Sequence, residues 1–324
     1  MTNTRQLPTK WLPLSEGPRK PRALAPGDRI AVIAPASSFA AEEFHAGLAE
    51  LTALGFVPEY EPSVFDRAIY TAGTPAVRAD ALRRAWADPG IAGIVTVRGG
   101  YGSVQLLPLL DAADFAGPPK VFLGYSDNTS LMAWLTLTCG VVTFHGPMIE
   151  RRLSRGEAGY DRDTLLRCVS RPAPVGRITH PHVEVIRPGN ASGMLVGGTM
   201  TSLAASLGTP YAFAPPEGCV LFLDEIAERP YRVDRLFTQL RYAGVIARAS
   251  ALVFNELPGC DEPNGCPRIR DVVAGLVSDF NGPVLFGLPS GHTPSPTLTI
   301  PFGVAARVDT GSEPGLIIEE AAVV

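Results

Sequence analysis

Short apolar runs alternate with segments of helical spacing through the first half of this sequence, and this alternation restricts the fold more than any other feature. Strands are predicted at 29–34, 56–58, 91–97, 120–123 and 141–144. Between them, apolar residues recur at helical spacing at about 40–54, 76–86 and 128–137. This pattern predicts an α/β fold, in which a parallel sheet is covered by helices on both faces. Ligands of such sheets bind beyond the carboxyl ends of the strands.

The rest of the chain predicts a second domain. A length of 324 residues suits two domains. We expect a flexible arm at 1–22, an α/β domain at 23–169, a connector at 170–190 and the second domain at 191–324. The segment 193–198 opens this domain, and its strands are predicted at 220–223, 251–254, 283–286, 298–300 and 316–320, the last of them at a sheet edge.

Charge and hydropathy argue against several classes of partner. A formal net charge of −4 gives no reason to expect nucleic acid or an anionic membrane surface. No apolar stretch reaches the roughly 18–20 residues that span a bilayer. The first 22 residues are polar and lack the apolar segment of a secretory signal. We therefore expect a cytoplasmic protein with no nucleic-acid partner and no membrane partner.

The cysteines and histidines do not predict a disulfide framework or a metal site. The five cysteines are odd in number and form no CxxC pair, which fits a reducing compartment. His180 and His182 form an isolated His-x-His without a third ligand motif, so we predict no bound metal.

The tetrad Gly124-Tyr125-Ser126-Asp127 joins an apolar strand to a helical segment. A serine at such a turn projects Oγ out of the sheet, and the first free N–H groups of the next helix point to the same place. One short segment then supplies a nucleophile and part of an oxyanion hole. A simple Ser-Asp helix cap is the alternative, and the α/β-hydrolase pattern would need glycine where this chain has Asn128.

A second candidate site group is the glycine-rich turn Gly99, Gly100 and Gly102, which also follows a strand. Its backbone N–H groups are suited to face a carboxylate or a developing oxyanion. The alternative is a tight turn without a ligand. The run is neither a P-loop nor GxGxxG, so a phosphate is not expected.

His292 lies in a segment rich in glycine and proline after an apolar strand, where a rigid loop would suit a general base. A capped loop histidine is the alternative. Asp224 and Glu225 end the strand 220–223, and a carboxylate there can orient a histidine. Adjacent residues of a strand point to opposite faces, so only one of the two acids should reach His292. His145, at another strand end, is predicted to be a buried histidine with its hydrogen bonds satisfied.

Taken together, these segments resemble the LD-carboxypeptidase family, serine peptidases that include muramoyl-tetrapeptide carboxypeptidases and microcin C self-immunity hydrolases. The resemblance covers nearly all of the chain after the first 22 residues. The matching segments are Leu24-Ala25-Pro26-Gly27-Asp28, Ile30–Pro35, Ser63-Val64-Phe65, Tyr70-Thr71-Ala72-Gly73, Arg98-Gly99-Gly100-Tyr101-Gly102, Gly124-Tyr125-Ser126-Asp127, Phe144-His145-Gly146-Pro147, Leu195-Val196-Gly197-Gly198, Pro230-Tyr231-Arg232-Val233-Asp234-Arg235 and Gly291-His292.

The resemblance implies a Rossmann-like N-terminal domain, a smaller β-rich α+β C-terminal domain and an active site in the cleft between them. It implies Ser126 as nucleophile and His292 as base. The backbone around Gly99, Gly100, Tyr101 and Asp127 would form the oxyanion hole and contact substrate. The resemblance implies a homodimer, and it implies neither a metal nor a cofactor.

Two positions depart from the family pattern. The family usually has Glu first in its acidic pair, whereas this chain has Asp224 followed by Glu225. Matching by position makes Asp224 the triad acid, which the fixed strand register favours, and matching by residue type makes it Glu225. Thr199 stands where the family commonly has Asn.

The expected function is release of a terminal D-alanine from cytosolic murein tetrapeptides by cleavage of an L,D-peptide bond, in cell-wall recycling. The D-alanine carboxylate requires a cationic or backbone anion site, for which Arg98, Arg232 and Arg241 are candidates. One alternative is an immunity-type hydrolase of aminoacyl-nucleotide antibiotics. Another is a muropeptide sensor without catalysis, against which the intact Ser126 and His292 argue.

Overall fold

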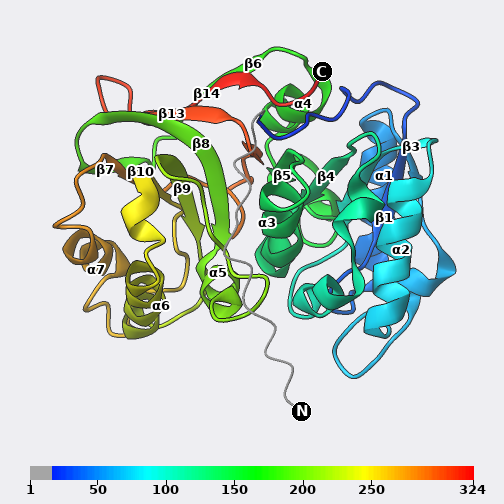
Figure 1. The fold of residues 1–324 in the computed structure, drawn as a ribbon, viewed down its shortest axis with the longest axis horizontal. Coiled ribbons are helices and arrows are strands. Elements are labelled where there is room, and N and C mark those ends of the chain that lie inside the picture. Colours follow the sequence, from blue (N-terminus) through cyan, green and yellow to red (C-terminus); the bar gives the residue numbers. More distant parts are fainter. Residues whose placement is uncertain (1–16) are drawn as a thin grey trace.

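The computed structural model describes residues 17–324, and these form two sheets that lie side by side (Figure 1). The predicted fold class is confirmed: a parallel sheet with flanking helices makes up the first half, and a second sheet makes up the other. Within the described part of the chain, no helix combines the length and the apolar character that a bilayer crossing requires.

The first sheet has six strands in the order β12-β5-β4-β3-β1-β2. Their bounds are β1 Arg29–Ile33, β2 Val57–Glu59, β3 Ile91–Thr96, β4 Val121–Gly124, β5 Thr143–His145 and β12 Ile300–Phe302. All neighbours pair in parallel except β12, which runs antiparallel to β5. Every residue of β3 and β4 is buried, as expected for central strands covered on both faces.

Helices flank this sheet, and three of them lie where the apolar spacing predicted them: α1 Ala41–Ala53, α2 Pro75–Ala87 and α3 Thr129–Leu137. The helix α4 Arg162–Ser170 was not predicted. Thr74 caps α2 by accepting a hydrogen bond from the N–H of Val77 at 3.4 Å. Segments of 3₁₀ helix lie at Pro62–Phe65, Ser103–Leu109, Ala112–Phe115, Ser126–Asn128 and Leu153–Ala158.

The second sheet has eight strands in the order β6-β14-β13-β8-β9-β10-β11-β7. Their bounds are β6 Pro174–Ile178, β7 Glu184–Arg187, β8 Asn190–Thr199, β9 Cys219–Asp224, β10 Ala249–Phe254, β11 Val284–Phe286, β13 Ala305–Asp309 and β14 Gly315–Ala321. Strands β8 to β11 pair in parallel, and the other pairs are antiparallel. The helices of this half are α5 Met200–Ser206, α6 Pro230–Tyr242 and α7 Ile269–Leu276, with a 3₁₀ turn at Ile246–Arg248.

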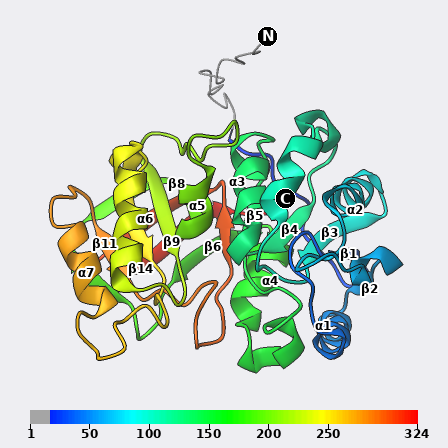
Figure 2. The same ribbon diagram turned by 90° about the horizontal axis from the view of Figure 1, so that it is seen from below.

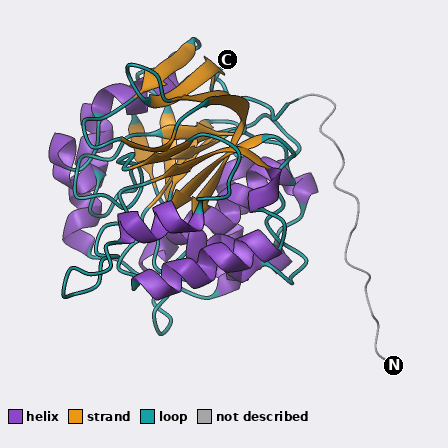
Figure 3. Ribbon diagram, turned by 90° about the vertical axis from the view of Figure 1, so that its left-hand side faces the viewer, coloured by secondary structure: helices purple, strands orange, loops and turns teal. Residues whose placement is uncertain are grey.

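Two apolar cores hold the layers together. One core contains the first sheet and also one face of the second sheet, through Phe222, Val253 and Leu285. The other fills the space between the opposite face and the helices α5, α6 and α7, which lie below the strands of this half in Figure 1. Figure 2 views the molecule from the side of these helices. Figure 3 shows strands at the centre of the molecule with helices around them. Because one core spans both sheets, residues at their contact are held in fixed positions.

Three boundary predictions are wrong. The segment 170–190 is not a plain connector, because it contributes β6 and β7 to the second sheet. Strand β12 lies within the predicted second domain in sequence, between β11 and β13, but pairs with β5 in the first sheet. The C-terminal strand β14 is not an edge strand, since it lies between β6 and β13.

The predicted arm 1–22 needs a partial correction. Residues 1–16 lie outside the described part of the chain, but 17–22 are bound to the first domain. The side chain of Arg19 donates hydrogen bonds to the carbonyls of Phe115, Ala116 and Gly117, and its N–H bonds Gly140 O at 2.7 Å. Because this guanidinium donates to several carbonyls, residues 17–22 are held in place although their sequence is polar.

Candidate active site

Ser126 and His292 meet at the contact between the two sheets. Ser126 follows the carboxyl end of β4 with φ +64°, a left-handed conformation that a residue with Cβ rarely adopts. This strained turn projects Oγ toward the second domain. His292 Nε2 lies 3.1 Å from Ser126 Oγ, within hydrogen-bond distance.

Asp224 completes the chain of hydrogen bonds from the end of β9. Phe222 of that strand packs on the ring of His145 in the core shared by the sheets, with 5.1 Å between ring centroids. Asp224 comes two residues later, so its side chain points to the same face. Its Oδ2 accepts a hydrogen bond from His292 Nδ1 at 2.8 Å, and its Oδ1 accepts one from the His292 N–H at 3.1 Å.

Glu225 points elsewhere. The preceding Leu223 belongs to the core beneath α5, α6 and α7, opposite to the core of Phe222. Glu225 Oε2 accepts hydrogen bonds from the N–H and Oγ1 of Thr201 at 2.9 and 2.7 Å, so this carboxylate is bound to the start of α5. Of the two acids, the structure brings Asp224 to His292.

Electrostatics favour an ionised acid beside a basic imidazole. Burial opposes the charge of Asp224, but the charge and hydrogen bond of His292 outweigh it, so the pKa of Asp224 lies below its ordinary value. Burial also opposes protonation of His292, but the charge and hydrogen bond of Asp224, together with the charge of Glu225, outweigh it, and the pKa of His292 is raised. The pKa of Glu225 is raised because burial outweighs its bonds from Thr201.

The raised pKa of His292 predicts how activity depends on pH. His292 accepts the serine proton only when it is neutral, so kcat/KM should rise with pH through the raised pKa of His292. The acid limb is expected above the ordinary value of 6.5. Measuring kcat/KM from about pH 5 to about pH 9 tests this. His45→Gln on the exposed part of α1 should leave the limb in place, and a wild-type limb centred below 6.5 would contradict the assignment.

Backbone N–H groups for an oxyanion lie close to Ser126. Within residues 17–324, the N–H groups of Gly100 and Asp127 donate to no other backbone group. Tyr101 contributes differently from expectation, because its N–H is directed to Ser37 Oγ at 3.1 Å. The Asp127 carboxylate accepts the N–H of Ser103 at 2.8 Å, so this side chain braces the turn rather than facing substrate.

Gly99 leaves the space that Ser126 occupies. A Cβ added at Gly99 would lie 2.6 Å from Ser126 Cβ, 2.7 Å from its Oγ and 3.2 Å from the N of Asp127. We therefore expect Gly99→Ala to displace the serine turn and lower kcat by about 10²-fold or more. Steady-state kinetics test this against Gly117→Ala, where an added Cβ meets no atom within 4 Å. Equal activity of both variants would contradict the close approach.

A pocket of about 290 Å³ opens beside Ser126 and takes its walls from both domains. The first domain supplies Gly100, Tyr101, Ser126 and Asp127, and the second supplies Thr199, Thr201, Glu225, Ile226, Glu228 and His292. All eight predicted site residues except Gly99 and Asp224 line it, and both exceptions lie directly behind lining residues. The pocket is large enough for a small peptide end rather than a folded protein.

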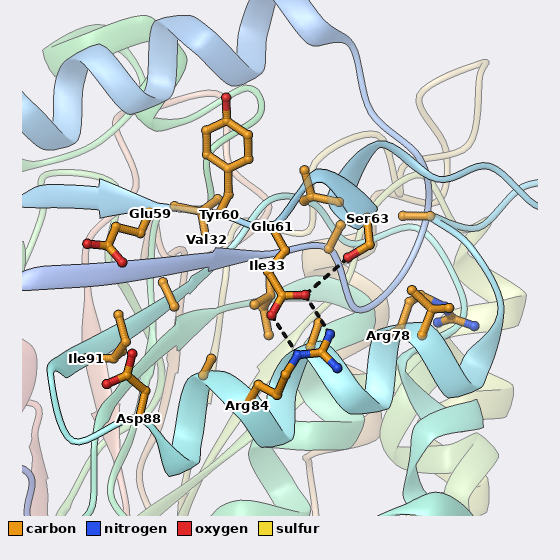
Figure 4. A pocket seen from close by; sticks show the side chains of 17 residues that line it. Val32, Ile33, Glu59, Tyr60, Glu61, Ser63, Arg78, Arg84, Asp88 and Ile91 are labelled. Carbon is orange, nitrogen blue, oxygen red and sulfur yellow. Dashed lines mark hydrogen bonds and ion pairs between the residues drawn. The ribbon is translucent and has the colours of Figure 1, made fainter.

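A second cavity, of about 330 Å³, lies between β1, β2 and α2, and Figure 4 shows the side chains that line it. Its floor is apolar, with Val32 and Ile33 among the lining residues. On its rim Glu61 accepts hydrogen bonds from Arg84 Nε at 2.7 Å and Nη2 at 2.6 Å (Figure 4). The described residues that line this cavity include no histidine, and none of them lines the pocket at Ser126. The candidate chemistry therefore lies in the pocket between the domains.

The remaining predicted histidines have other environments. His145 is fully buried, with Nδ1 3.0 Å from Ser290 Oγ, but its Nε2 has no hydrogen-bond partner among residues 17–324. Burial lowers the pKa of His145 to about 4. His182 pairs with Glu256 at 3.0 Å rather than with a metal set. In the described chain, no cluster of three or more His, Cys, Asp or Glu is arranged for a metal ion.

Sequence reasoning missed Asn255 and the role of Thr199. Asn255 Nδ2 donates to Asp224 Oδ1 at 2.5 Å and to His292 O at 2.6 Å. Thr199 Oγ1 donates to Asp224 Oδ2 at 2.9 Å. Asn255 follows the end of β10, next to the end of β9 in a parallel pair, and this position is the signal that would have found it.

The two halves of the chain match the two domain models of one family. Residues 30–146 match the LD-carboxypeptidase N-terminal domain, and residues 192–308 match the LD-carboxypeptidase C-terminal domain. A putative carboxypeptidase of Streptomyces coelicolor is 36% identical over 301 residues, which are 90% of this chain and 93% of that protein. The murein tetrapeptide carboxypeptidase of Pseudomonas aeruginosa is 30% identical over 273 residues, covering 82% and 88%.

The fold also matches solved structures. The microcin C7 self-immunity protein MccF superposes with a TM-score of 0.87 at 23% identity, over 95% of this chain and 100% of that one. At this identity the likeness concerns the fold, while the family models and the carboxypeptidase relatives extend to sequence. The chain therefore belongs to the LD-carboxypeptidase family, and it is a carboxypeptidase.

Proposed function

We propose that the protein is a serine-type L,D-carboxypeptidase that releases terminal D-alanine from murein tetrapeptides. One observation carries this proposal: Ser126, His292 and Asp224 form a continuous chain of hydrogen bonds, at 3.1 and 2.8 Å, beside a pocket between two domains. The P. aeruginosa relative, a murein tetrapeptide carboxypeptidase, supports the choice of substrate.

The proposed reaction is acyl transfer through Ser126. His292 Nε2 takes the proton from Ser126 Oγ while Oγ attacks the carbonyl carbon of the L,D-peptide bond. Asp224 holds the Nδ1–H and stabilises the imidazolium that forms. The N–H groups of Gly100 and Asp127 stabilise the oxyanion. The C–N bond then breaks as the leaving amine takes the proton from His292. Water next attacks the acyl group on Ser126 while His292 takes its proton. His292 returns this proton to Ser126 Oγ as the acid product leaves.

The leaving D-alanine carries a carboxylate, and Arg232 is the candidate to bind it. Arg98 is held by the buried Glu150 at 3.2 Å, and Arg241 contacts Leu276 O and Asp279, neither of which lines the pocket. Arg232 instead pairs at 3.3 Å with Glu228, a residue that lines the pocket. Both side chains are solvent-accessible, so the pair can open to admit an anion.

We expect Arg232→Ala to raise KM about tenfold with kcat nearly unchanged, because the contact binds ground state and transition state alike. The same substitution at Arg241 is the matched control, since Arg241 is held at Asp279 and Leu276. Initial rates over a range of tetrapeptide concentrations separate the two constants. Equal KM values for the two variants would remove Arg232 from the substrate site.

The test of the function is mass spectrometry of the purified protein with L-Ala-γ-D-Glu-meso-diaminopimelate-D-Ala. Loss of one D-alanine with wild type, and none with Ser126→Ala, is the expected result. No release by wild type, while a covalent serine probe still labels Ser126, would overturn the substrate. No labelling of Ser126 would instead refute Ser126 as the nucleophile.

A second candidate is hydrolysis of an aminoacyl nucleotide, as expected of an immunity-type enzyme. Tyr101 lines the pocket and is 46% exposed, and the ring of exposed Tyr70 lies 5.7 Å from it at an edge-on angle. Such rings offer a surface on which a nucleobase can stack. Release of the amino acid from an aminoacyl sulfamoyl adenosine, faster than D-alanine from the tetrapeptide, would support this function over the first.

We also propose a cytoplasmic homodimer that acts in cell-wall recycling. The five cysteines, of which four are described as buried or partly buried free thiols, suit a reducing compartment. The homodimer follows from the family resemblance. Light scattering after size exclusion tests it, and a single species with the mass of one 34.3 kDa chain would contradict it.

A further inference from the structure

Arg152 is a buried cation between the two domains whose hydrogen bonds all go to neutral oxygens. Arg152 is 9% exposed. Nη2 donates to the carbonyls of Gly291 and Thr293 at 2.7 and 2.9 Å, and Nη1 donates to Ser295 O at 3.3 Å. Further bonds reach Gly159 O at 3.4 Å and Tyr125 OH at 3.3 Å. A buried guanidinium that donates this many hydrogen bonds restricts the positions of the carbonyls and the phenol that accept them.

The positions of these partners connect Arg152 to His292 and Ser126. Gly291 and Thr293 are the two neighbours of His292 in sequence, so their carbonyls hold the histidine from both sides. Tyr125 precedes Ser126, and its ring packs edge-on against His292 with 5.1 Å between centroids. One side chain of the first domain thus contacts the segment of the proposed base and the segment of the proposed nucleophile.

The backbone beneath Arg152 is itself fixed to the first sheet. The N–H of Ile149 bonds Thr96 O at 3.2 Å, and the N–H of Glu150 bonds Val97 O at 2.9 Å, both at the end of β3. Arg152 therefore links the first sheet, which holds Ser126, to the loop of His292 in the second domain.

We infer that Arg152 is a positioning residue that sets the distance between His292 and Ser126 across the domain contact. This inference rests on the proposed function of those two residues. A displacement of about 1 Å in a reacting group costs about 10²-fold in rate, so a clamp on both neighbours of the base has a kinetic effect. Lysine keeps the charge but offers a single nitrogen, which cannot reach the separate carbonyls and the phenol together.

The experiment compares Arg152→Lys, Arg152→Met and Arg152→Ala with the same substitutions at Arg151, its exposed neighbour. The first readout is the rate at which a fluorophosphonate probe labels Ser126. We expect a loss of about tenfold for Lys and about 10²-fold for Met at 152, and none at 151. Guanidinium ions at millimolar concentration should restore part of the rate in Arg152→Ala, because they refill the space of the lost group.

The second readout is the downfield proton NMR signal of the His292 Nδ1–H, assigned by its loss in His292→Gln. It should broaden or shift in the Arg152 variants and stay unchanged in the Arg151 variants. If Arg152→Met does not fold, Arg152→Lys decides. A folded Lys variant with wild-type labelling and an unchanged signal overturns the inference, as does an equal loss at both arginines.

These readouts separate this inference from the proposed function. Labelling needs a reactive serine but no peptide, and the NMR signal needs neither. A wild type that is labelled but releases no D-alanine refutes the substrate and leaves the Arg152 result standing. A wild type that is not labelled refutes the nucleophile, and the NMR signal then reports by itself whether Arg152 holds His292.

Discussion

Replacing Ser126 by alanine is expected to lower kcat by at least about 10⁴-fold while the protein keeps its fold. The loss follows from the reaction, because no other hydroxyl is both hydrogen-bonded to His292 and aimed at the pocket in the described chain. The stability cost should be small, about 1 kcal/mol, since the removed group makes one bond of 3.1 Å to His292. Alanine also keeps a Cβ at φ +64°, so the strain of the turn is unchanged.

The measurement is D-alanine release beside thermal unfolding, with Ser278→Ala as control. Ser278 is exposed, its Oγ donates to Gly275 O at 2.8 Å, and it does not line the pocket. Wild-type turnover by the control and loss in Ser126→Ala, at similar unfolding temperatures, is the expected pair of results. Turnover of Ser126→Ala within about tenfold of wild type would show that another group acts as nucleophile.

Residues at strand ends were predictable because one rule places them. Parallel strands bring their carboxyl ends to one edge, so Gly99 after β3 and Ser126 after β4 were expected to meet. They do: the two residues are so close that Gly99 has no room for a Cβ. The same rule extended to β9 and β10 would have paired Asp224 with Asn255.

Contacts made by loops and by late strands were not predictable. Strand β12 lies in sequence between β11 and β13 of the second sheet yet pairs with β5, because its apolar residues fill the core shared by both sheets. Arg152 lies in a segment with no periodic pattern, and its partners are backbone carbonyls, which every residue has. A sequence therefore contains no local signal for such a clamp.

The two departures from the family pattern lie next to each other in space. Thr199 Oγ1 donates to Asp224 Oδ2 at 2.9 Å, so the residue that replaces Asn contacts the residue that replaces Glu. The shorter acid still reaches His292, because the loop approaches β9 closely enough for the His292 N–H to bond Asp224 Oδ1 at 3.1 Å. Gly291, with φ +74°, permits this approach, since an added Cβ would lie 3.0 Å from Asp224 Oδ2.

Asp224→Asn is expected to lower kcat by about 10⁴-fold, whereas Glu225→Gln should change it by less than about tenfold. An amide at 224 removes the charge that stabilises the imidazolium, and its NH₂ group, if turned to His292, favours the wrong tautomer. At 225 the carboxylate accepts hydrogen bonds from Thr201 at Oε2 and from the Ile226 N–H at Oε1, at 3.2 Å, and does not contact His292. A glutamine whose oxygen takes the place of Oε2 keeps both bonds from Thr201 and loses only the one from Ile226. Steady-state rates of both variants decide between the two acids.

The pH profile of each variant gives a second, independent test of which acid, Asp224 or Glu225, acts on His292. Asp224 raises the pKa of His292, so Asp224→Asn should move the acid limb of the residual activity to lower pH. Glu225 also raises that pKa, but as a smaller and longer-range effect than Asp224, so Glu225→Gln should move the limb in the same direction by less. A larger rate loss and a larger limb shift in Glu225→Gln would reverse the assignment, because the acid that holds the imidazole must dominate both its charge and its orientation.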